Sequence, residues 1–227
     1  MSVATQLAEL LELRRQPVAV AFLEKAPDGV AAIEEPAPSG CAYWKYAADG
    51  RTFYTLASDH YGCPIGAHTH GIDLPEETAQ ELQGLIGTMV ELQYLDPDEV
   101  AGIPQLQGKF GVAVYAPAAD AGFDPDVVIV SGTAKQMMLL AEAAQSAGVA
   151  CDSSMVGRPT CAALPTVIQS GRSVSNLGCI GNRVYTEMED DELYFAFAGG
   201  QLEPIVEKLE IITNANRELE AFHRARV

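Results

Sequence analysis

The feature that most constrains the fold of this 227-residue chain is an ordered echo between its two halves. Each half carries a Cys-Ala pair, a helical stretch, a Gly-Arg-Thr/Ser triplet, a leucine and then a second cysteine ahead of a glycine. The matching residues are Cys41, Gly50-Arg51-Thr52, Leu56 and Cys63 in one half, and Cys161, Gly171-Arg172-Ser173, Leu177 and Cys179 in the other. Shared order of this kind indicates an internal duplication. We predict one domain, 1–227, of two diverged half-repeats, roughly 1–105 and 106–227, related by a pseudo-two-fold axis.

Apolar runs typical of buried strands alternate with helical patterns along the chain. Strands are predicted at 17–23, 110–115, 127–130 and 192–197, and helices around 7–11, 82–92, 133–148 and 202–212. Asp73 is the expected N-cap of the second helix, with Pro75 in its first turn, and Thr133 and Gln136 form a capping box. This alternation predicts an α/β fold, or α+β, with a mixed sheet and helices.

The charge balance excludes several classes of partner. Fourteen Lys and Arg residues stand against 31 Asp and Glu residues, and the formal net charge is −17. A surface of that sign repels phosphate backbones and anionic lipids, so we expect neither nucleic acid nor membrane as a partner. No signal peptide or transmembrane run is present in the sequence, and the predicted location is cytoplasmic.

Five cysteines in a reducing compartment point to metal binding, catalysis or burial rather than to disulfides. Cys41 and Cys161 are predicted in the first turns of helices, where the helix dipole lowers a thiol pKa. Cys63 and Cys179 are predicted in turns. If the half-repeats meet about an axis, these four thiolates converge on one iron–sulfur cluster of the 4Fe-4S type, with zinc as the less favoured metal. Cys151 has no counterpart in the first half and is assigned to packing.

Three of the four histidines gather around Cys63. His60, His68 and His70 are candidate catalytic residues, since imidazole beside thiolate can carry protons, activate a cysteine or ligate a metal. The second half offers Asn182 and Arg183 at the matching place, which are donors suited to an anion or a carboxylate. The predicted site is therefore asymmetric. Arg51 and Arg172 are expected to pair with carboxylates, and Tyr43 and Trp44 to lie in the core.

The sequence resembles a family known as domain of unknown function 169, found largely in archaea and anaerobic bacteria. The resemblance rests on segments spread along the chain: 17–23, the helix of Cys41, 53–55, 59–67, 114–117, 126–128, Cys179-Ile180-Gly181 and 190–193. It implies one full-length domain and no assigned activity.

Three functions of different classes remain open. The preferred one is an iron–sulfur or other thiolate-metal protein in redox chemistry, electron transfer or metal handling, with a small molecule or a redox protein as partner. The second is a cofactor-free enzyme with Cys63 as nucleophile and a nearby histidine as base. The third is a small-molecule binding or sensor module. No dinucleotide, Walker, zincin or serine-hydrolase motif is found. A homodimer through the N-terminal helix is a candidate assembly.

Overall fold

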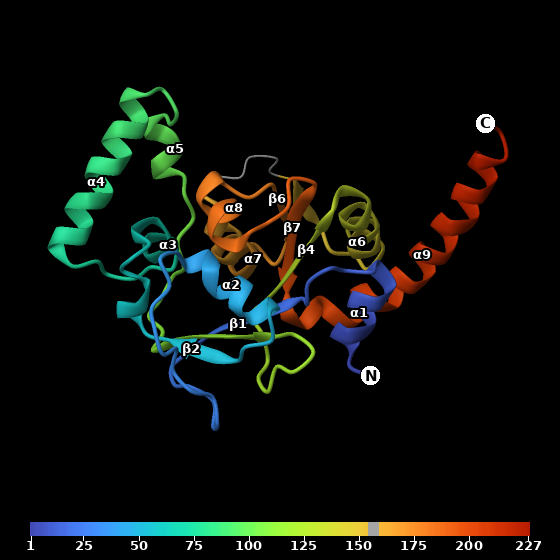
Figure 1. Ribbon diagram of the computed structural model, residues 1–227, viewed down its shortest axis with the longest axis horizontal. Coiled ribbons are helices and arrows are strands. Elements are labelled where there is room, and N and C mark those ends of the chain that lie inside the picture. The colour runs from blue at the N-terminus through green and yellow to red at the C-terminus, as the bar shows by residue number, and fades with distance from the viewer. Residues whose placement is uncertain (154–158) are drawn as a thin grey trace.

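Within residues 1–153 and 159–227, the part of the chain that the computed structural model describes, seven strands form one mixed sheet (Figure 1). Their order is β2-β3-β1-β4-β7-β6-β5. The strands are β1 (Val18–Leu23), β2 (Phe53–Thr55), β3 (Val112–Pro117), β4 (Val127–Thr133), β5 (Cys151–Ser153), β6 (Ser173–Asn176) and β7 (Glu192–Ala198). The α/β class is confirmed. The central strands β1, β3 and β4 are continuous Val- and Ala-rich runs that are buried along most of their length, as expected for strands inside a sheet.

The two sides of the sheet meet at the contact between β1 and β4. These two strands pair antiparallel over Val18–Val20 and Val127–Ile129. Counted outward from there, β3 and β2 follow on the side of β1, and β7, β6 and β5 follow on the side of β4. Strand β3 lies beyond the predicted boundary near residue 105, and β5 has no counterpart on the other side. Each half also runs helix, strand, helix across its echo segment. Strand order does not test superposition, so the pseudo-two-fold axis stays a prediction.

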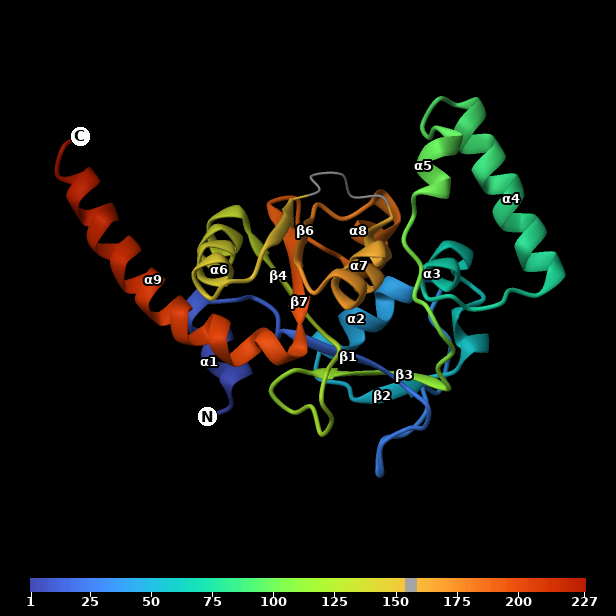
Figure 2. The same ribbon diagram turned by 180° about the vertical axis from the view of Figure 1, so that it is seen from behind.

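Helices cover the two faces of the sheet (Figure 2). The α-helices are α1 (Val3–Leu11), α2 (Gly40–Ala48), α3 (Pro64–Thr69), α4 (Glu76–Glu91), α5 (Pro97–Ala101), α6 (Ala134–Ser146), α7 (Ala163–Ser170), α8 (Ile180–Thr186) and α9 (Leu202–Arg224). Short 3-10 turns are η1 (Ala57–His60), η2 (Thr160–Ala162) and η3 (Gly199–Gln201). Helices α2 and α7 cover one face, and α1, α6 and α9 cover the other.

The two faces carry separate apolar clusters. Tyr43 and Trp44 of α2 lie in the first, as predicted, with Tyr115 of β3. Phe197 of β7 and Leu140 of α6 lie in the second. Aromatic rings stack through the first cluster, where Phe53 and Tyr115 have centroids 5.4 Å apart. The candidate functional site lies on this first face of the sheet.

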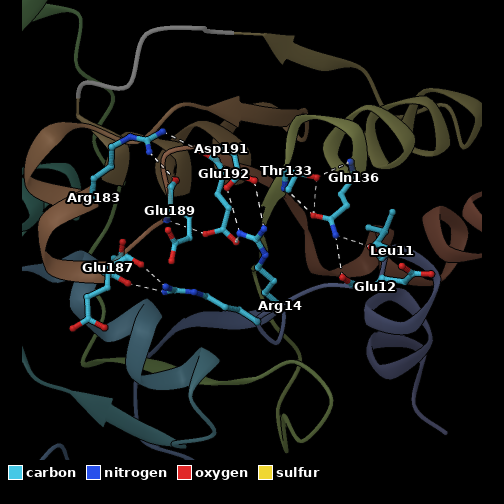
Figure 3. Close-up of polar contacts among 12 residues, drawn as sticks. Leu11, Glu12, Arg14, Thr133, Gln136, Arg183, Glu187, Glu189, Asp191 and Glu192 are labelled. Carbon is cyan, nitrogen blue, oxygen red and sulfur yellow. Dashed lines mark hydrogen bonds and ion pairs between the residues drawn. The ribbon is translucent and has the colours of Figure 1, made fainter.

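The capping box at the start of α6 is confirmed. The Gln136 side-chain oxygen accepts from the Thr133 backbone N–H at 2.7 Å, and the Gln136 N–H donates to the Thr133 hydroxyl at 3.5 Å. The same Gln136 amide donates to the carbonyls of Leu11 and Glu12, which ties α6 to the end of α1 (Figure 3). The predicted N-cap Asp73 was wrong: Pro75 precedes α4 in extended conformation, and Asp73 pairs instead with Lys109 at 3.3 Å.

Two segments extend away from the sheet. Helices α4 and α5 stand apart from the body on one side, and the far half of α9 projects on the other (Figures 1 and 2). Only Leu82 of α4 is buried, whereas Leu85 of the same helix and Leu92, its C-cap residue, are exposed. No helix in the described part of the chain is long and apolar enough to cross a membrane.

Candidate functional site

The four echoed cysteines lie at the starts of helical segments on one face of the sheet. Cys41 is the second residue of α2, behind the N-cap Ser39. Cys63 and Cys179 are the N-cap residues of α3 and α8, and Cys161 lies in η2, which leads into α7. Helix α2 contacts α3, α8 and η2, and α3 contacts η2. The fold thus brings together the four cysteines that the sequence singled out.

The thiols are close enough to affect one another's ionisation. Burial raises the pKa of the Cys41 thiol to about 12, and the Cys63 and Cys179 thiols add to this shift. Burial also raises the pKa of Cys161 well above its usual range, and the other three thiols reinforce the shift. The expected pKa lowering by the helix dipole was therefore wrong for Cys41 and Cys161, because desolvation outweighs the dipole. Without a cation, both buried thiols are protonated at neutral pH.

The cysteines differ in exposure. Cys41 and Cys161 are 5% and 4% exposed, whereas Cys63 and Cys179 are half-buried. In the described residues, no group of three or more His, Cys, Asp or Glu side chains is placed to hold a metal ion. Thiolates that share one zinc lie about 2.3 Å from it. The four thiols are therefore neighbours without being a preformed site for a single ion.

Unpartnered polar atoms gather in the same region. In the part of the chain that the structure describes, seven buried side-chain nitrogen or oxygen atoms have no hydrogen-bond partner: Trp44 Nε1, His60 Nδ1, both ring nitrogens of His70, the Tyr115 hydroxyl and both amide atoms of Asn182. A buried polar atom left in this state costs about 1–3 kcal/mol. Such a concentration indicates an interior that a ligand or water completes.

Several of these atoms lie beside the thiols. The Asn182 amide faces the Cys41 thiol and lowers its pKa, although the contact lacks the geometry of a hydrogen bond. Burial raises the pKa of Tyr115, and Tyr43, Cys41 and Cys161 raise it further. His60 Nδ1 faces Gly40, the residue before Cys41, since a Cβ there would lie 3.8 Å from it. Asn182 and Tyr115 thus join the cysteines from α8 and β3.

The three predicted histidines occupy different surroundings. His60 and His70 are each 1% exposed, and their ring centroids lie 5.1 Å apart. His60 Nε2 is 2.8 Å from the Thr55 hydroxyl, while His68 is half-buried against the Gln105 amide. No histidine ring in the described residues is hydrogen-bonded to a cysteine; Cys63 Sγ lies 3.8 Å from the Ser39 hydroxyl. A nucleophile and base pair at Cys63 is thus not formed in this structure.

Burial of the histidine pair predicts acid sensitivity. Burial lowers the pKa of His60 to about 4 and that of His70 well below its usual value. The unfolded chain binds protons at His60 below about pH 6.5, whereas the folded chain does not until about pH 4, so stability falls as pH drops through this window. We expect His60 alone to remove about 2 kcal/mol between pH 7 and pH 5. Urea unfolding of chelator-treated protein at both pH values measures the loss.

The control for this prediction is His60→Gln, whose loss of stability between pH 7 and pH 5 should be smaller than that of the natural chain. Equal losses in the two proteins would show that His60 is not a neutral buried group. Comparison of the two removes the contribution of the carboxylates, which both proteins share.

Arg183 stabilises the fold through backbone hydrogen bonds and is not placed to bind an anion. Its guanidinium donates to the carbonyls of Leu177, Glu189 and Glu192 at 2.6, 3.0 and 3.0 Å (Figure 3). These bonds tie the turn before Cys179 to the loop between α8 and β7. Arg14 holds the same loop through Asp191 at 3.3 Å. The expected carboxylate or anion contact of Arg183 is replaced by three backbone carbonyls.

Removal of this clamp should loosen the Cys179 turn. We expect Arg183→Met to lower the free energy of unfolding by roughly 2–3 kcal/mol, since bonds from a charged donor to three carbonyls are lost. Arg217→Met, which removes an exposed arginine of α9 bonded to Asn214, should change stability by less than about 0.5 kcal/mol. Urea denaturation measures both. Equal, small effects would show that the loop holds its shape without Arg183.

The other arginine and cysteine predictions have mixed outcomes. Arg172 pairs with Asp152 at 3.4 Å, as expected, but Arg51 lies over the rings of Tyr46 and Phe53. Cys151 lies in β5 and packs against the second apolar cluster, as predicted. Sequence reasoning missed Tyr115, because a tyrosine inside a Val- and Ala-rich strand carries no sign of a polar role.

The comparisons with known proteins match most of the length of the chain, and none of them assigns an activity. A model of the family described as uncharacterised ArCR, domain of unknown function 169, matches residues 6–208. An uncharacterised protein from Methanocaldococcus jannaschii is 26% identical over 216 residues, which span 91% of this chain and 92% of that protein. No solved structure matches the chain. The residues matched by the family contain all four site cysteines.

Proposed function

Because the chain belongs to the uncharacterised ArCR family, whose description names no activity, we propose its function from the site alone: Cys41, Cys63, Cys161 and Cys179 hold an iron–sulfur cluster. The role would be redox chemistry, electron transfer or metal handling. A small molecule or a redox protein would be the partner, and the reducing cytoplasm, which keeps thiols free, would be the location. All five cysteines are free thiols here, which is compatible with that compartment.

One observation carries this proposal: four thiols from four different elements adjoin a set of buried polar atoms that lack partners. Folding has placed these atoms away from water at a cost of about 1–3 kcal/mol each. Thiolate ligands and nearby hydrogen-bond donors are what an iron–sulfur cluster takes from a protein. Bound metal would also reverse the ionisation of the thiols, since a coordinating thiol is deprotonated.

The arrangement favours a cluster over a single zinc ion. Four cysteines on one zinc must all approach within about 2.3 Å of the same point. The described cysteines, which do not form such a group, would have to close further around one ion than around a larger cluster. Zinc is therefore the less favoured of the two candidate cofactors, which is also the order that the sequence suggested.

Residues of this chain have separate parts in the proposed site. The four cysteines would be ligands, two of them buried and two facing the surface. The Asn182 amide and one ring N–H of His70 would donate hydrogen bonds, and such bonds to sulfur tune the reduction potential of a cluster. When bound, the cluster would supply one-electron chemistry.

The enzyme alternative at Cys63 has less support. Its nucleophile would need a general base within about 3 Å, and the neighbour of Cys63 Sγ is the Ser39 hydroxyl. Helix α3 also packs closely there, since a Cβ at Gly66 would lie 3.0 Å from Cys63 Sγ. A base would reach Cys63 only after a rearrangement of η1 or α3.

Anaerobic purification tests the proposal. We expect a brown protein with about four iron and four acid-labile sulfide atoms per chain. Elemental analysis beside a sulfide assay gives both numbers. One zinc per chain without sulfide would show that the site holds zinc and not a cluster. A colourless chain without metal would overturn the proposal.

A further inference from the structure

Two helices project from opposite sides of the molecule, and each of them carries exposed apolar side chains (Figures 1 and 2). Helix α4 and its C-cap present Leu85 and Leu92, which are 47% and 74% exposed. The far half of α9 presents Ile211, Leu219 and Phe222, which are 61%, 54% and 54% exposed. We propose that α4 of one copy of this chain binds the far half of α9 of another copy. This contact does not depend on the proposed cluster.

The exposed apolar stripe of α9 lies on a different side of the helix from the packed face. Residues three or four positions apart share one side of a helix. The exposed stripe follows this spacing through Ile211, Ala215, Leu219 and Phe222. The packed face buries Leu209 and Thr213, and α9 contacts α1 and α6. A helix that only covers the core of its own chain has one apolar face, so the second stripe of α9 calls for a partner.

Helix α4 is amphipathic but buries little of its apolar surface. Leu82 is its one buried residue, and the helix packs against α3. Leu85, Met89 and Leu92 follow helical spacing, and the two leucines are exposed. Burial of apolar surface stabilises a contact by about 25 cal/mol per Å². Each of the two projecting helices therefore has a stripe that another molecule would cover favourably.

The charges of the two helices favour α4 with α9 over α4 with α4. No Lys or Arg occurs between Arg51 and Lys109, whereas nine Asp and Glu residues do, four of them in α4. The last eleven residues carry Arg217, Arg224 and Arg226. Complementary charges steer two surfaces together, and like charges suppress the wrong pairing. The acidic helix α4 thus fits the arginine-bearing end of α9 and repels a second α4.

These charges are not neutralised within the chain. In the described residues, neither Arg217 nor Arg226 forms an ion pair, and the same holds for the carboxylates of α4. Arg226 lies 5.1 Å from the centre of the Phe222 ring, which places a positive charge beside the apolar stripe. Glu220 is already paired with Arg224 at 2.6 Å. The end of α9 therefore combines an apolar stripe with unpaired arginines.

The contact between two helices is small. Specific interfaces bury about 1,200–2,000 Å² in total, and one helix pair lies at or below the lower end of this range. We expect a reversible association that depends on concentration, with most copies monomeric in the dilute solutions used for unfolding. Each copy carries one α4 and one α9, so copies that are blocked at different helices still have one complementary pair between them.

Sedimentation velocity of the full chain over a range of concentrations tests this contact. Anaerobic, reducing conditions prevent disulfides between copies. We expect the sedimentation coefficient to rise with concentration above that of the monomer. Leu85→Arg places a base on α4, and Leu219→Glu places an acid on α9, so each change should weaken association by at least about tenfold. A natural chain that stays monomeric up to about 0.3 mM would overturn the proposal.

A mixture of the two blocked variants identifies the pairing. Leu85→Arg keeps its α9, and Leu219→Glu keeps its α4, so an equimolar mixture should form a 1:1 dimer although neither variant associates alone. Gln83→Arg and Ala221→Glu are the matched controls, because they make the same charge changes at exposed positions on other sides of these helices. Both controls should associate like the natural chain. A mixture that stays monomeric, or controls that are impaired as much as the blocked variants, would contradict the pairing of α4 with α9.

Discussion

Serine at Cys63 or at Cys179 should remove most of the iron and sulfide from the anaerobically purified protein. Each residue is an N-cap, and the Asn182 N–H already donates to Cys179 Sγ at 3.5 Å. Serine is a good N-cap residue, so both variants keep the helix start while losing a soft thiolate ligand. The folded chain should therefore persist, but without the part of its stability that metal binding supplies. Metal per chain and the unfolding midpoint are the two measurements.

Cys151→Ser is the matched control, because Cys151 lies in β5 and packs against the apolar cluster on the other side of the sheet. It should keep the full metal content. Undiminished iron in Cys63→Ser and Cys179→Ser would end the four-cysteine assignment. Iron lost equally from all three variants would show that metal content follows general folding and not ligation.

Phe197→Ala should lower the free energy of unfolding by about 3–5 kcal/mol. The ring is 0% exposed in the cluster between the sheet and α6 and α9, where it lies 6.3 Å from the ring of Phe195. The loss combines the transfer of the ring to water with the cavity left behind. A domain of ordinary stability has about 5–15 kcal/mol in total, so this single change removes a large share. Urea denaturation with an unchanged slope measures it.

Phe222→Ala, on the projecting end of α9, is the comparison. Its ring is 54% exposed and lies under the Arg226 guanidinium at 5.1 Å, so its removal should change stability by no more than about 0.5 kcal/mol. A loss near that of Phe197→Ala would mean that another molecule covers this end of α9. A loss below about 1 kcal/mol at Phe197 would contradict the described core.

Local sequence signals predicted the elements well. Apolar runs predicted β1, β3, β4 and the aromatic-rich β7, and the capping box of Thr133 and Gln136 predicted the start of α6. These signals are local, since they depend on side chains a few positions apart. The start of α4 was misplaced by two residues, because Asp73 has the chemistry of a cap but pairs with Lys109, and Pro75 is the N-cap residue.

Long-range relations in the site were predicted in part. The echo of Cys41 and Cys63 in the second half correctly drew attention to residues that the fold brings together. Their ionisation was not predicted, because desolvation depends on how completely Cys41 and Cys161 are buried, and burial is a property of the packed molecule. The three histidines looked equivalent in sequence, yet His70 lies against Phe22 in the interior while His68 lines a groove.

The position of β7 has a consequence for the order of events during synthesis. This strand begins at residue 192, and it lies between β4 and β6 in the sheet. Strand β6, which separates Cys161 from Cys179 in sequence, therefore reaches the sheet only through a neighbour that the ribosome makes later. A nascent chain that ends at residue 190 contains all four cysteines but lacks the strand that joins the two pairs. If these cysteines hold the proposed cluster, the complete site would form only after β7 has been synthesised, and a product truncated before residue 192 would lack the strand that joins its two pairs.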